Sequence, residues 1–553
     1  MSGVPSTPRP KSTLEPTTPA AESTQRPAAV GSHLHVPSPH YQTTRRHSLY
    51  GTEDRVVLDP GSRVWKVGFS GEGRPRDVFT VGYEGSGLWE LTNAENLEEK
   101  EEKQHVLEAE VQKHLRYVFH KHVDFIVIVE NPLIPVPTKE LLARVLFDNL
   151  QVPSLSFTSS HLLSLLAVGR ISGLVLDAGH LESVVLPVVS SRPLYSCLKS
   201  TPLAGSALTS HLRHLLLKYG SYIPPTPLSG AAIIRPTRVP EELLTDALLE
   251  EIKTRCCFVA APLSVDDTTP MVVQLGDSML DNPNLLEAME ASSVNDDTET
   301  MYSSAVPESH QSSYDPSPQA IFDIYMRNSN TKTLSMKVLP STNTSASNVR
   351  ATLVIPGWVR ERAAEYLFQG DIDESSVAEV VLDSLLKIPR DLRKSMISSI
   401  LVVGGTAMLP GFISRLNLEI VRALTSRDEN NKRKKRLPYN PYRCLQPLLP
   451  YVGILNSPSL APSTAKVNLT KAPAFSPAAL PWIGGSLAGS LKTGGSEITR
   501  ERWDEVDQDY EEAETSNILT VNIDRNPIPD WSRVPLSSEA LSFTPSLPSM
   551  VSG

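Results

Sequence analysis

Two short stretches of this sequence share one pattern, and that pattern constrains the fold more than any other feature. VVLDPGSRVWKVGFSG and GLVLDAGHLESVVLPV each predict an apolar strand, an Asp-x-Gly turn and a second strand. Asp59 and Gly61 in the first stretch have the same spacing as Asp177 and Gly179 in the second. The repeat indicates an internally duplicated α/β protein, in which each half begins with the same hairpin.

The chemistry of such a turn points to phosphate. Glycine lets successive backbone N–H groups face one point, which makes a cradle for an anion. Two facing cradles would clamp a polyphosphate, with Asp59 and Asp177 holding a hydrated Mg²⁺ through water and Lys66 offering a positive charge. The alternative is ordinary hairpin chemistry, because Asp and Gly are common in turns that bind nothing.

The rest of the chain predicts one folded body that is interrupted twice. Strands and helices alternate after a Ser/Thr/Pro-rich start, and amphipathic helices return at AEVVLDSLLKI and LRKSMISSI. Polar stretches with few apolar residues predict segments without a packed core. We assign disordered tails to residues 1–50 and 506–553, a mostly disordered insertion to 263–348, a second insertion to 425–459, and the α/β body to 51–262, 349–424 and 460–505.

Charge and cysteine content exclude several kinds of function. The formal net charge is −10 over 553 residues, so nucleic acid is not the expected direct partner. The four cysteines have no C-x-x-C spacing, which argues against a zinc or disulfide framework and fits a reducing compartment. No stretch reaches the ~20 apolar residues of a membrane span, and no signal peptide is recognisable, so we expect a soluble intracellular protein.

A third motif, SILVVGGTAMLPGFISRLNLEI, joins an apolar strand to Gly404, Gly405 and the start of a helix. Two adjacent glycines would let the backbone approach a flat ring closely. With the two hairpins, the order of GGTAMLPGF, LAPST, PWIGGSLAGSL and ITRERWDE resembles actin over roughly residues 55–262 and 350–505. Sugar kinases and heat-shock chaperone ATPases share the hairpins, but LAPST and PWIGGS are typical of the actin branch.

The resemblance implies a two-lobed actin-like fold with a reduced outer subdomain and a site for ATP or ADP with Mg²⁺. The residues that match the family's nucleotide-contacting positions, or lie in the same motifs, are Asp59, Gly61, Ser62, Lys66, Asp177, Gly179, Lys253, Gly404 and Gly405. Arg63 replaces a glycine of the first phosphate turn. Thr254 replaces a glutamate beside the adenosine, and Ala478 replaces a lysine. We therefore expect altered or weakened binding.

We expect little or no hydrolysis and no enzyme activity, because the family's water-positioning residues are missing. The resemblance places Ser160 at the position of a glutamine and Val184 at that of a histidine. His180 stands where a second aspartate supports the metal, and a neutral imidazole is a poor ligand for Mg²⁺. The alternatives are that His180 is only a solvent-facing turn residue, and that the chain is an active ATPase.

The segment between Val78–Phe79 and Val129–Pro132 is shorter than the matching part of an actin, which builds the outer subdomain and the loop that enters the next subunit. A subunit without that loop could join a filament end but could not be followed by another. The resemblance is therefore to the divergent, fungal-type actin-related protein of dynactin, the adaptor complex of cytoplasmic dynein in microtubule-based transport.

That resemblance implies a cytoplasmic, cytoskeletal subunit that caps the pointed end of dynactin's actin-like filament, recruits other pointed-end subunits and forms no homopolymer. The alternative within the family is a nuclear actin-related subunit of a chromatin-remodelling complex. The run KRKKR at Lys432–Arg436 is compatible with an import signal, although a basic run in a polar insertion is more often merely solvated.

Overall fold

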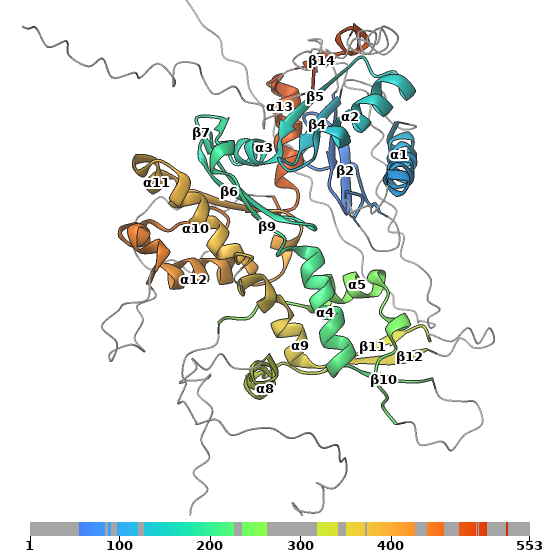
Figure 1. The fold of residues 1–553 in the computed structure, drawn as a ribbon, viewed down its shortest axis with the longest axis vertical. Coiled ribbons are helices and arrows are strands. Elements are labelled where there is room, and N and C mark those ends of the chain that lie inside the picture. The colour runs from blue at the N-terminus through green and yellow to red at the C-terminus, as the bar shows by residue number, and fades with distance from the viewer. Residues whose placement is uncertain are drawn as a thin grey trace, which may run out of the picture. The chain divides into compact units, whose positions relative to one another are not determined.

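The computed structural model describes residues 55–82, 87–89, 97–119, 126–225, 235–262, 318–340, 350–370, 373–425, 440–457, 475–493, 495, 497–505 and 527–528. Within them the strands form three sheets, and helices lie between and around these sheets (Figure 1). The predicted tails lie outside the described residues except for 527–528, and so does the LAPST motif. None of the described helices is both long enough and apolar enough to cross a membrane.

The first sheet contains the first Asp-x-Gly hairpin. Its strand order is β14-β5-β4-β1-β2-β3, and β1 pairs antiparallel with β2 and parallel with β4. The strands are β1 (Val56–Pro60), β2 (Val64–Phe69), β3 (Asp77–Thr80), β4 (Ile126–Glu130), β5 (Ser154–Ser159) and β14 (Glu497–Thr499).

The second sheet repeats this arrangement around the second hairpin. Its order is β13-β6-β7-β8, with β9 also paired to β7, and β6 runs antiparallel to β7 and parallel to β13. The strands are β6 (Gly173–Ala178), β7 (Ser183–Val189), β8 (Arg192–Pro193), β9 (Lys199–Thr201) and β13 (Ile400–Val403). Each hairpin is thus the antiparallel neighbour of a parallel strand pair, and the predicted internal duplication is confirmed.

The helices that the sequence predicted are present. TKELLARVLFDNL forms α2 and a following π-helical turn, SSHLLSLLAVGR forms α3, and the two amphipathic stretches form α10 and α11. The helices are α1 (Leu97–Phe119), α2 (Val136–Arg144), α3 (Ser160–Ala167), α4 (Gly205–Tyr219), α5 (Asp246–Cys256), α8 (Pro318–Asn328), α9 (Gly357–Arg362), α10 (Val377–Lys387), α11 (Arg390–Ile397), α12 (Phe412–Thr425) and α13 (Leu480–Leu491).

A third, smaller sheet corrects one predicted boundary. Its order is β10-β12-β11, with β10 at Ser221–Ile223, β11 at Leu334–Val338 and β12 at Ala351–Ile355. Both β11 and α8 fall inside the segment 263–348 that the sequence assigned to an insertion. They belong to the folded body because Tyr325 and Val338 are buried in its main core. The structure therefore starts the second part of the body at residue 318, not 349.

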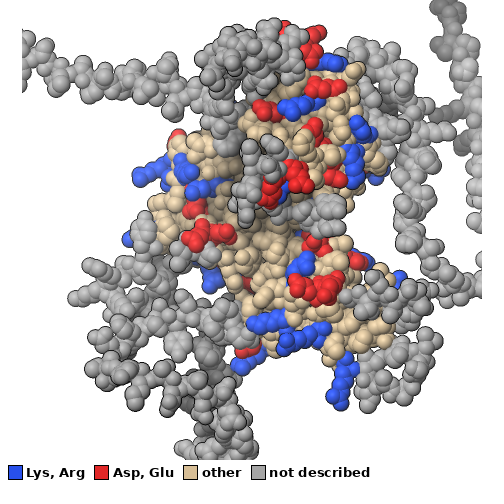
Figure 2. All heavy atoms as spheres, turned by 45° about the vertical axis from the view of Figure 1, so that its right-hand side comes forward, with Lys and Arg blue, Asp and Glu red and all other residues tan. Residues whose placement is uncertain are grey.

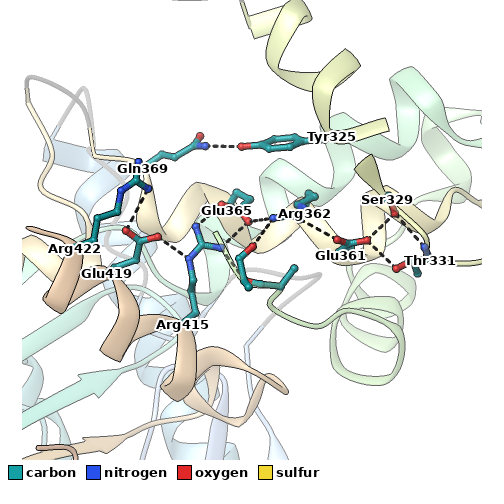
Figure 3. A network of polar contacts seen from close by, with 12 residues as sticks. Tyr325, Ser329, Thr331, Glu361, Arg362, Glu365, Gln369, Arg415, Glu419 and Arg422 are labelled. Carbon is teal, nitrogen blue, oxygen red and sulfur yellow. Dashed lines mark hydrogen bonds and ion pairs between the residues drawn. The ribbon is translucent and has the colours of Figure 1, made fainter. Parts of the chain in front are cut away.

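A buried ion-pair network fixes the segment that carries α8 and β11 to the folded body (Figure 3). Glu365, in the 3₁₀ helix η5 (Ala363–Phe368), accepts hydrogen bonds from Arg415 Nη2 at 2.6 Å and from Arg362 Nη1 at 2.9 Å. Arg415 Nη1 also donates to the carbonyl of Ala260 and Arg362 Nη1 to that of Ala261, each at 2.8 Å. The last residues before the undescribed stretch are thus held by buried arginines.

The same network also contacts α8 and the residues just after it, which follow the undescribed stretch 263–317. Glu361 pairs with Arg362 at 3.0 Å, and its Oε2 accepts hydrogen bonds from the hydroxyls of Ser329 at 2.6 Å and Thr331 at 2.8 Å. Gln369 Nε2 donates to the Tyr325 hydroxyl at 2.8 Å. Both ends of the stretch 263–317 therefore meet the same group of buried charges. A long insertion between fixed ends costs little additional chain entropy.

The second predicted insertion, 425–459, is also shorter than the sequence suggested. Residues 440–457 are described, and most of them form the 3₁₀ helix η8 (Pro441–Tyr451). Tyr442 and Leu445 are buried in the main core, and the Tyr442 hydroxyl donates to Asp383 Oδ1 at 3.0 Å. The structure therefore returns residues 440–457 to the folded body, and residues 426–439 and 458–459 of the predicted insertion lie outside the described residues.

Helices α13 and α3 join the first sheet to the second (Figure 1). Gly484 of α13 faces the backbone of α3, and a Cβ added there would lie 1.8 Å from the carbonyl oxygen of Leu163. Trp482 Nε1 donates to the carbonyl of Val57 in β1 at 3.0 Å. Leu163 packs in a cluster with the first sheet, whereas Leu165 packs with the second. The PWIGGS motif is therefore a site of close helix packing.

Replacing Gly484 with alanine is expected to reduce the free energy of unfolding by about 3 kcal/mol or more, because the added methyl group meets backbone that only a helix shift could move. Urea unfolding of the full chain would measure the change. Gly73→Ala is the matched control: a Cβ at Gly73 meets nothing within 4 Å, so its effect should stay within about 0.5 kcal/mol. Equal stability of the two variants would refute this role of Gly484.

Candidate functional site

A cavity of about 530 Å³ lies between the two Asp-x-Gly hairpins. It is lined by the turns β1–β2 and β6–β7, by the start of α4, by α5 and by the Gly-Gly stretch after β13. Its volume falls within the range of small-molecule sites. All nine residues that the sequence singled out for a nucleotide line this one cavity.

The first turn presents a carboxylate that is already paired. Asp59 lies opposite Lys66 in the β1–β2 register, and Lys66 Nζ lies 2.7 Å from Asp59 Oδ2, with both side chains largely buried. Gly61 is required here because a Cβ would lie 2.6 Å from the carbonyl oxygen of Val64. Lys66 therefore lines the cavity as predicted, but its charge already neutralises Asp59.

The second turn is held by its own backbone and by two neighbouring elements. The Gly179 N–H donates to the carbonyl of Glu182 at 3.0 Å. The Gly179 carbonyl accepts hydrogen bonds from the Gly205 N–H, at the start of α4, at 3.1 Å and from the Thr406 hydroxyl at 2.6 Å. These contacts fix the turn against the cavity wall.

Each glycine of the Gly-Gly pair has its own structural role. Gly404 has a φ of +99°, and a Cβ there would lie 2.3 Å from the carbonyl oxygen of Ala178 and 2.6 Å from Asp177 Oδ1. Gly405 has nothing within 4 Å of an added Cβ. The first glycine therefore lets β13 approach the second turn, and the second leaves open space beside the backbone, into which a flat ring fits.

The electrostatics of the two turns fit a hydrated divalent cation. Burial and the nearby charge of Asp59 raise the pKa of Asp177 to about 6, and Lys66 offsets this only in part. The described residues contain no group of three or more His, Cys, Asp or Glu side chains that could ligate a metal directly. Mg²⁺ needs only one or two protein carboxylates and keeps several waters. Asp59 and Asp177 therefore suit an ion held through water.

Lys253 is positioned by the protein itself. Its ammonium donates to the Gly205 carbonyl at 3.1 Å and to the Thr209 hydroxyl at 2.8 Å, and it forms an ion pair with Glu250. Burial lowers the pKa of Lys253, and the pairing with Glu250 opposes that shift. Four further residues also line the cavity, namely Ser62, Arg63, Thr254 and Ala478. Residues that match the family pattern and residues that depart from it therefore lie at the same site.

Buried side chains occupy the two positions that the resemblance assigns to water activation. Val184 is fully buried in β7, and Ser160 is 4% exposed, with its hydroxyl 3.1 Å from His161 Nδ1. His161 has no exposed surface, and burial lowers its pKa to about 4. His180 lines the cavity and is not a freely solvated turn residue; burial and then Lys253 lower its pKa to about 4. Both imidazoles are therefore neutral near pH 7.

Sequence reasoning missed three residues that line the cavity. Glu182 ends the second turn, Glu250 pairs with Lys253 and Thr406 bonds to the turn carbonyl. A signal existed for Glu250, which lies three residues before Lys253 on one helix. No comparable signal existed for Glu182, because the residue after a turn can face either side of the sheet.

Comparison with known proteins agrees with this geometry. A model of the actin family, described as Actin, matches residues 88–515. The match begins after the first hairpin, which the structure nevertheless pairs with β4 of the matched region. Actin-related protein 10 of Dictyostelium discoideum is 24% identical over 398 residues, which cover 68% of this chain and 65% of that protein.

Two further relatives match shorter parts. Actin-like protein 7A of Rattus norvegicus is 32% identical over 135 residues, which cover 24% of this chain and 27% of the relative. Actin-like protein 9 of Homo sapiens is 27% identical over 241 residues, which cover 39% and 53% respectively. The chain thus spans from about a quarter to less than two thirds of the length of these curated relatives.

Replacing Asp177 with asparagine is expected to stabilise the protein when nucleotide and metal are absent. Because the pKa of Asp177 is raised from 3.8 to about 6, its ionised form costs stability, which falls as pH rises through that interval. The full cost, on the order of 3 kcal/mol, is present above pH 6. Asp177→Asn should therefore raise the free energy of unfolding at pH 7.5 and raise it much less at pH 4.5.

Thermal unfolding of the EDTA-treated full chain would measure this effect, with the exposed Asp504→Asn as the neutral control. Added Mg²⁺ and ADP should then stabilise the wild type more than Asp177→Asn, because the variant lacks one of the two oxygens that hold the ion. A loss of stability at both pH values in EDTA would mean that the carboxylate is needed as a structural hydrogen-bond acceptor.

Proposed function

Because this chain belongs to the actin family, we propose that it is a structural subunit that caps the pointed end of dynactin's actin-like filament. In this role it recruits the other pointed-end subunits and supports dynein-driven transport along microtubules in the cytoplasm. It binds ATP or ADP with Mg²⁺ in the cavity between the two hairpins and hydrolyses it slowly or not at all.

The observation that carries this proposal is the small structure between β3 and β4. The described residues there form the single helix α1, which lies against the aromatic side chains at the sheet edge. The ring of His114 in α1 is tilted against that of Trp65, with the centroids 5.6 Å apart, and it stacks on Phe79 at a centroid distance of 5.9 Å. Val111 and Leu115 are fully buried. By resemblance, an actin builds at this place the subdomain and loop that receive the next subunit.

Helix α1 packs back on its own sheet, so the described part of this segment offers nothing that reaches into a neighbouring subunit. Filament growth requires a heterologous contact that every subunit both offers and accepts. With only one half of that contact, the chain can bind the last subunit of a filament and leave no acceptor for another. The match to actin-related protein 10, which covers 68% of this chain, supports an actin-related protein over a filament-forming actin.

The cavity supports binding without efficient turnover. The two turns, the hydrated-ion site and the Gly-Gly stretch remain, whereas Ser160 and Val184 supply no base or amide to orient a water molecule. Nucleotide then acts as a part of the structure that links the two sheets. When bound, Mg²⁺ would neutralise phosphate charge beside Asp59 and Asp177.

ATP turnover by the purified full chain is expected to be at least about 10²-fold slower than that of an actin filament, because misplacing the attacking water has a cost of that size. Single-turnover release of phosphate from labelled ATP would measure the rate, and Asp177→Asn would show how much comes from contaminating enzymes. Turnover that matches polymerising actin and disappears in Asp177→Asn would contradict the proposal.

The nuclear alternative rests on the basic run Lys432–Arg436, which lies outside the described residues. On the face shown in Figure 2, acidic and basic side chains are interspersed over the described part, which supports a role without direct nucleic acid contact. A fluorescent fusion of the full chain separates the two functions. Moving particles along microtubules support the dynactin role, and accumulation in the nucleus supports the alternative.

The chain alone is expected to stay monomeric by light scattering under conditions that assemble actin, because it lacks the accepting half of the filament contact. Added to a dynactin-type filament, it should appear once per filament, at the pointed end. Its depletion should leave that end without the companion subunits. Electron microscopy of gold-labelled protein would locate it.

Grafting an actin subdomain onto the chain tests whether the short segment between β3 and β4 causes capping. Replacing residues 80–128 with the outer subdomain of an actin should allow further subunits to add. The matched control carries the same subdomain with its inserting loop exchanged for a Gly/Ser linker, and it should still cap. Long homopolymers of the native chain, or binding along filament sides, would show that the short segment does not cause capping.

A further inference from the structure

Acidic and basic side chains both line the cavity. The carboxylates are Asp59, Asp177, Glu182 and Glu250, and the cations are Arg63, Lys66 and Lys253. Lys66 is engaged with Asp59, and Lys253 is engaged with Glu250. Arg63 acts electrostatically on His180 and on Lys253.

Glu182 lines the cavity and has no neutralising partner among the described residues. It has no side-chain hydrogen bond or ion pair with any residue that the structure describes, and it is partly buried. Its carbonyl accepts the Gly179 N–H at 3.0 Å, so the residue is tied to the second phosphate turn. Burial and then Asp177 raise the pKa of Glu182 to about 7, and no cation contributes.

We propose that Glu182 is a selectivity residue that makes the cavity prefer the magnesium complex of a nucleoside diphosphate to that of a triphosphate. The inference rests on the nucleotide binding proposed above. A third phosphate adds about one negative charge to a cavity whose wall includes the Glu182 carboxylate, and two of the cations of this cavity, Lys66 and Lys253, are already engaged by carboxylates. Like charges in a partly buried site repel strongly, because little water screens them.

The preference for the diphosphate complex follows from the Glu182 carboxylate. Asp59 and Asp177 can share a hydrated cation, so a bound Mg²⁺ offsets their charge. Glu182 lines the same cavity and adds one further negative charge to it. The diphosphate complex carries the smaller negative charge and is repelled less.

The test compares MgADP and MgATP binding to the full chain by titration of a fluorescent adenine nucleotide at pH 8, where Glu182 is ionised. The wild type should bind MgADP about tenfold more tightly than MgATP, and Glu182→Gln should reduce that ratio to about twofold, chiefly by tightening MgATP. Glu242→Gln, an exposed site outside the cavity, is the matched control and should keep the wild-type ratio.

Each outcome decides a separate point. Equal wild-type affinities for the two nucleotides would overturn the selectivity while leaving nucleotide binding intact. Weaker binding of both nucleotides by Glu182→Gln would overturn it in favour of a third metal-supporting carboxylate. No binding of either nucleotide by any form would overturn the proposed nucleotide site, and this inference with it. The wild-type ratio needs no substitution, so the proposal stays testable even if Glu182→Gln fails to fold.

Discussion

The backbone contact between α13 and α3 holds the cavity together. Because Gly484 has no side chain, α13 lies directly on the carbonyl of Leu163, and Trp482 fixes the same helix to β1. Leu163 faces the first sheet and Leu165 the second, so the pair of helices sets the separation of the two hairpins. The two halves of the duplicated fold each supply a turn, and this contact helps to bring both turns to the wall of one cavity.

Two of the three cationic side chains that line the cavity are paired inside the protein. Lys66 is held by Asp59, and Lys253 is held by Glu250. Under the function proposed above, a polyphosphate would therefore depend on a divalent cation more than on these lysine side chains. Val184 is buried, and burial lowers the pKa of His161 and His180 to about 4, so neither imidazole carries a charge near pH 7.

The insertion is compatible with the fold because its ends are fixed. Arg362 and Arg415 hold the carbonyls of residues 260 and 261, and Glu361 holds Ser329 and Thr331 across the gap (Figure 3). Removing one partner of such a buried network leaves an uncompensated charge, so its members depend on one another. Sequence reasoning placed α8 and β11 in the insertion because each is short and lies between polar stretches. The strand partner of β11 is β12, which comes only after residues 341–349.

The sequence by itself determined the duplicated α/β class and the two hairpins, because turn chemistry and strand patterns are local properties. The resemblance to actin added the rest of the nine residues that were singled out, all of which line the cavity. The sequence could not determine that Lys66 is paired with Asp59, that Val184 is buried, or that Glu182 lines the cavity. Those facts depend on which side of a strand faces the opposite half. Tertiary structure decided them because burial and charge pairing arise only when segments more than a hundred residues apart in the chain, such as Asp59 and Asp177, meet in space.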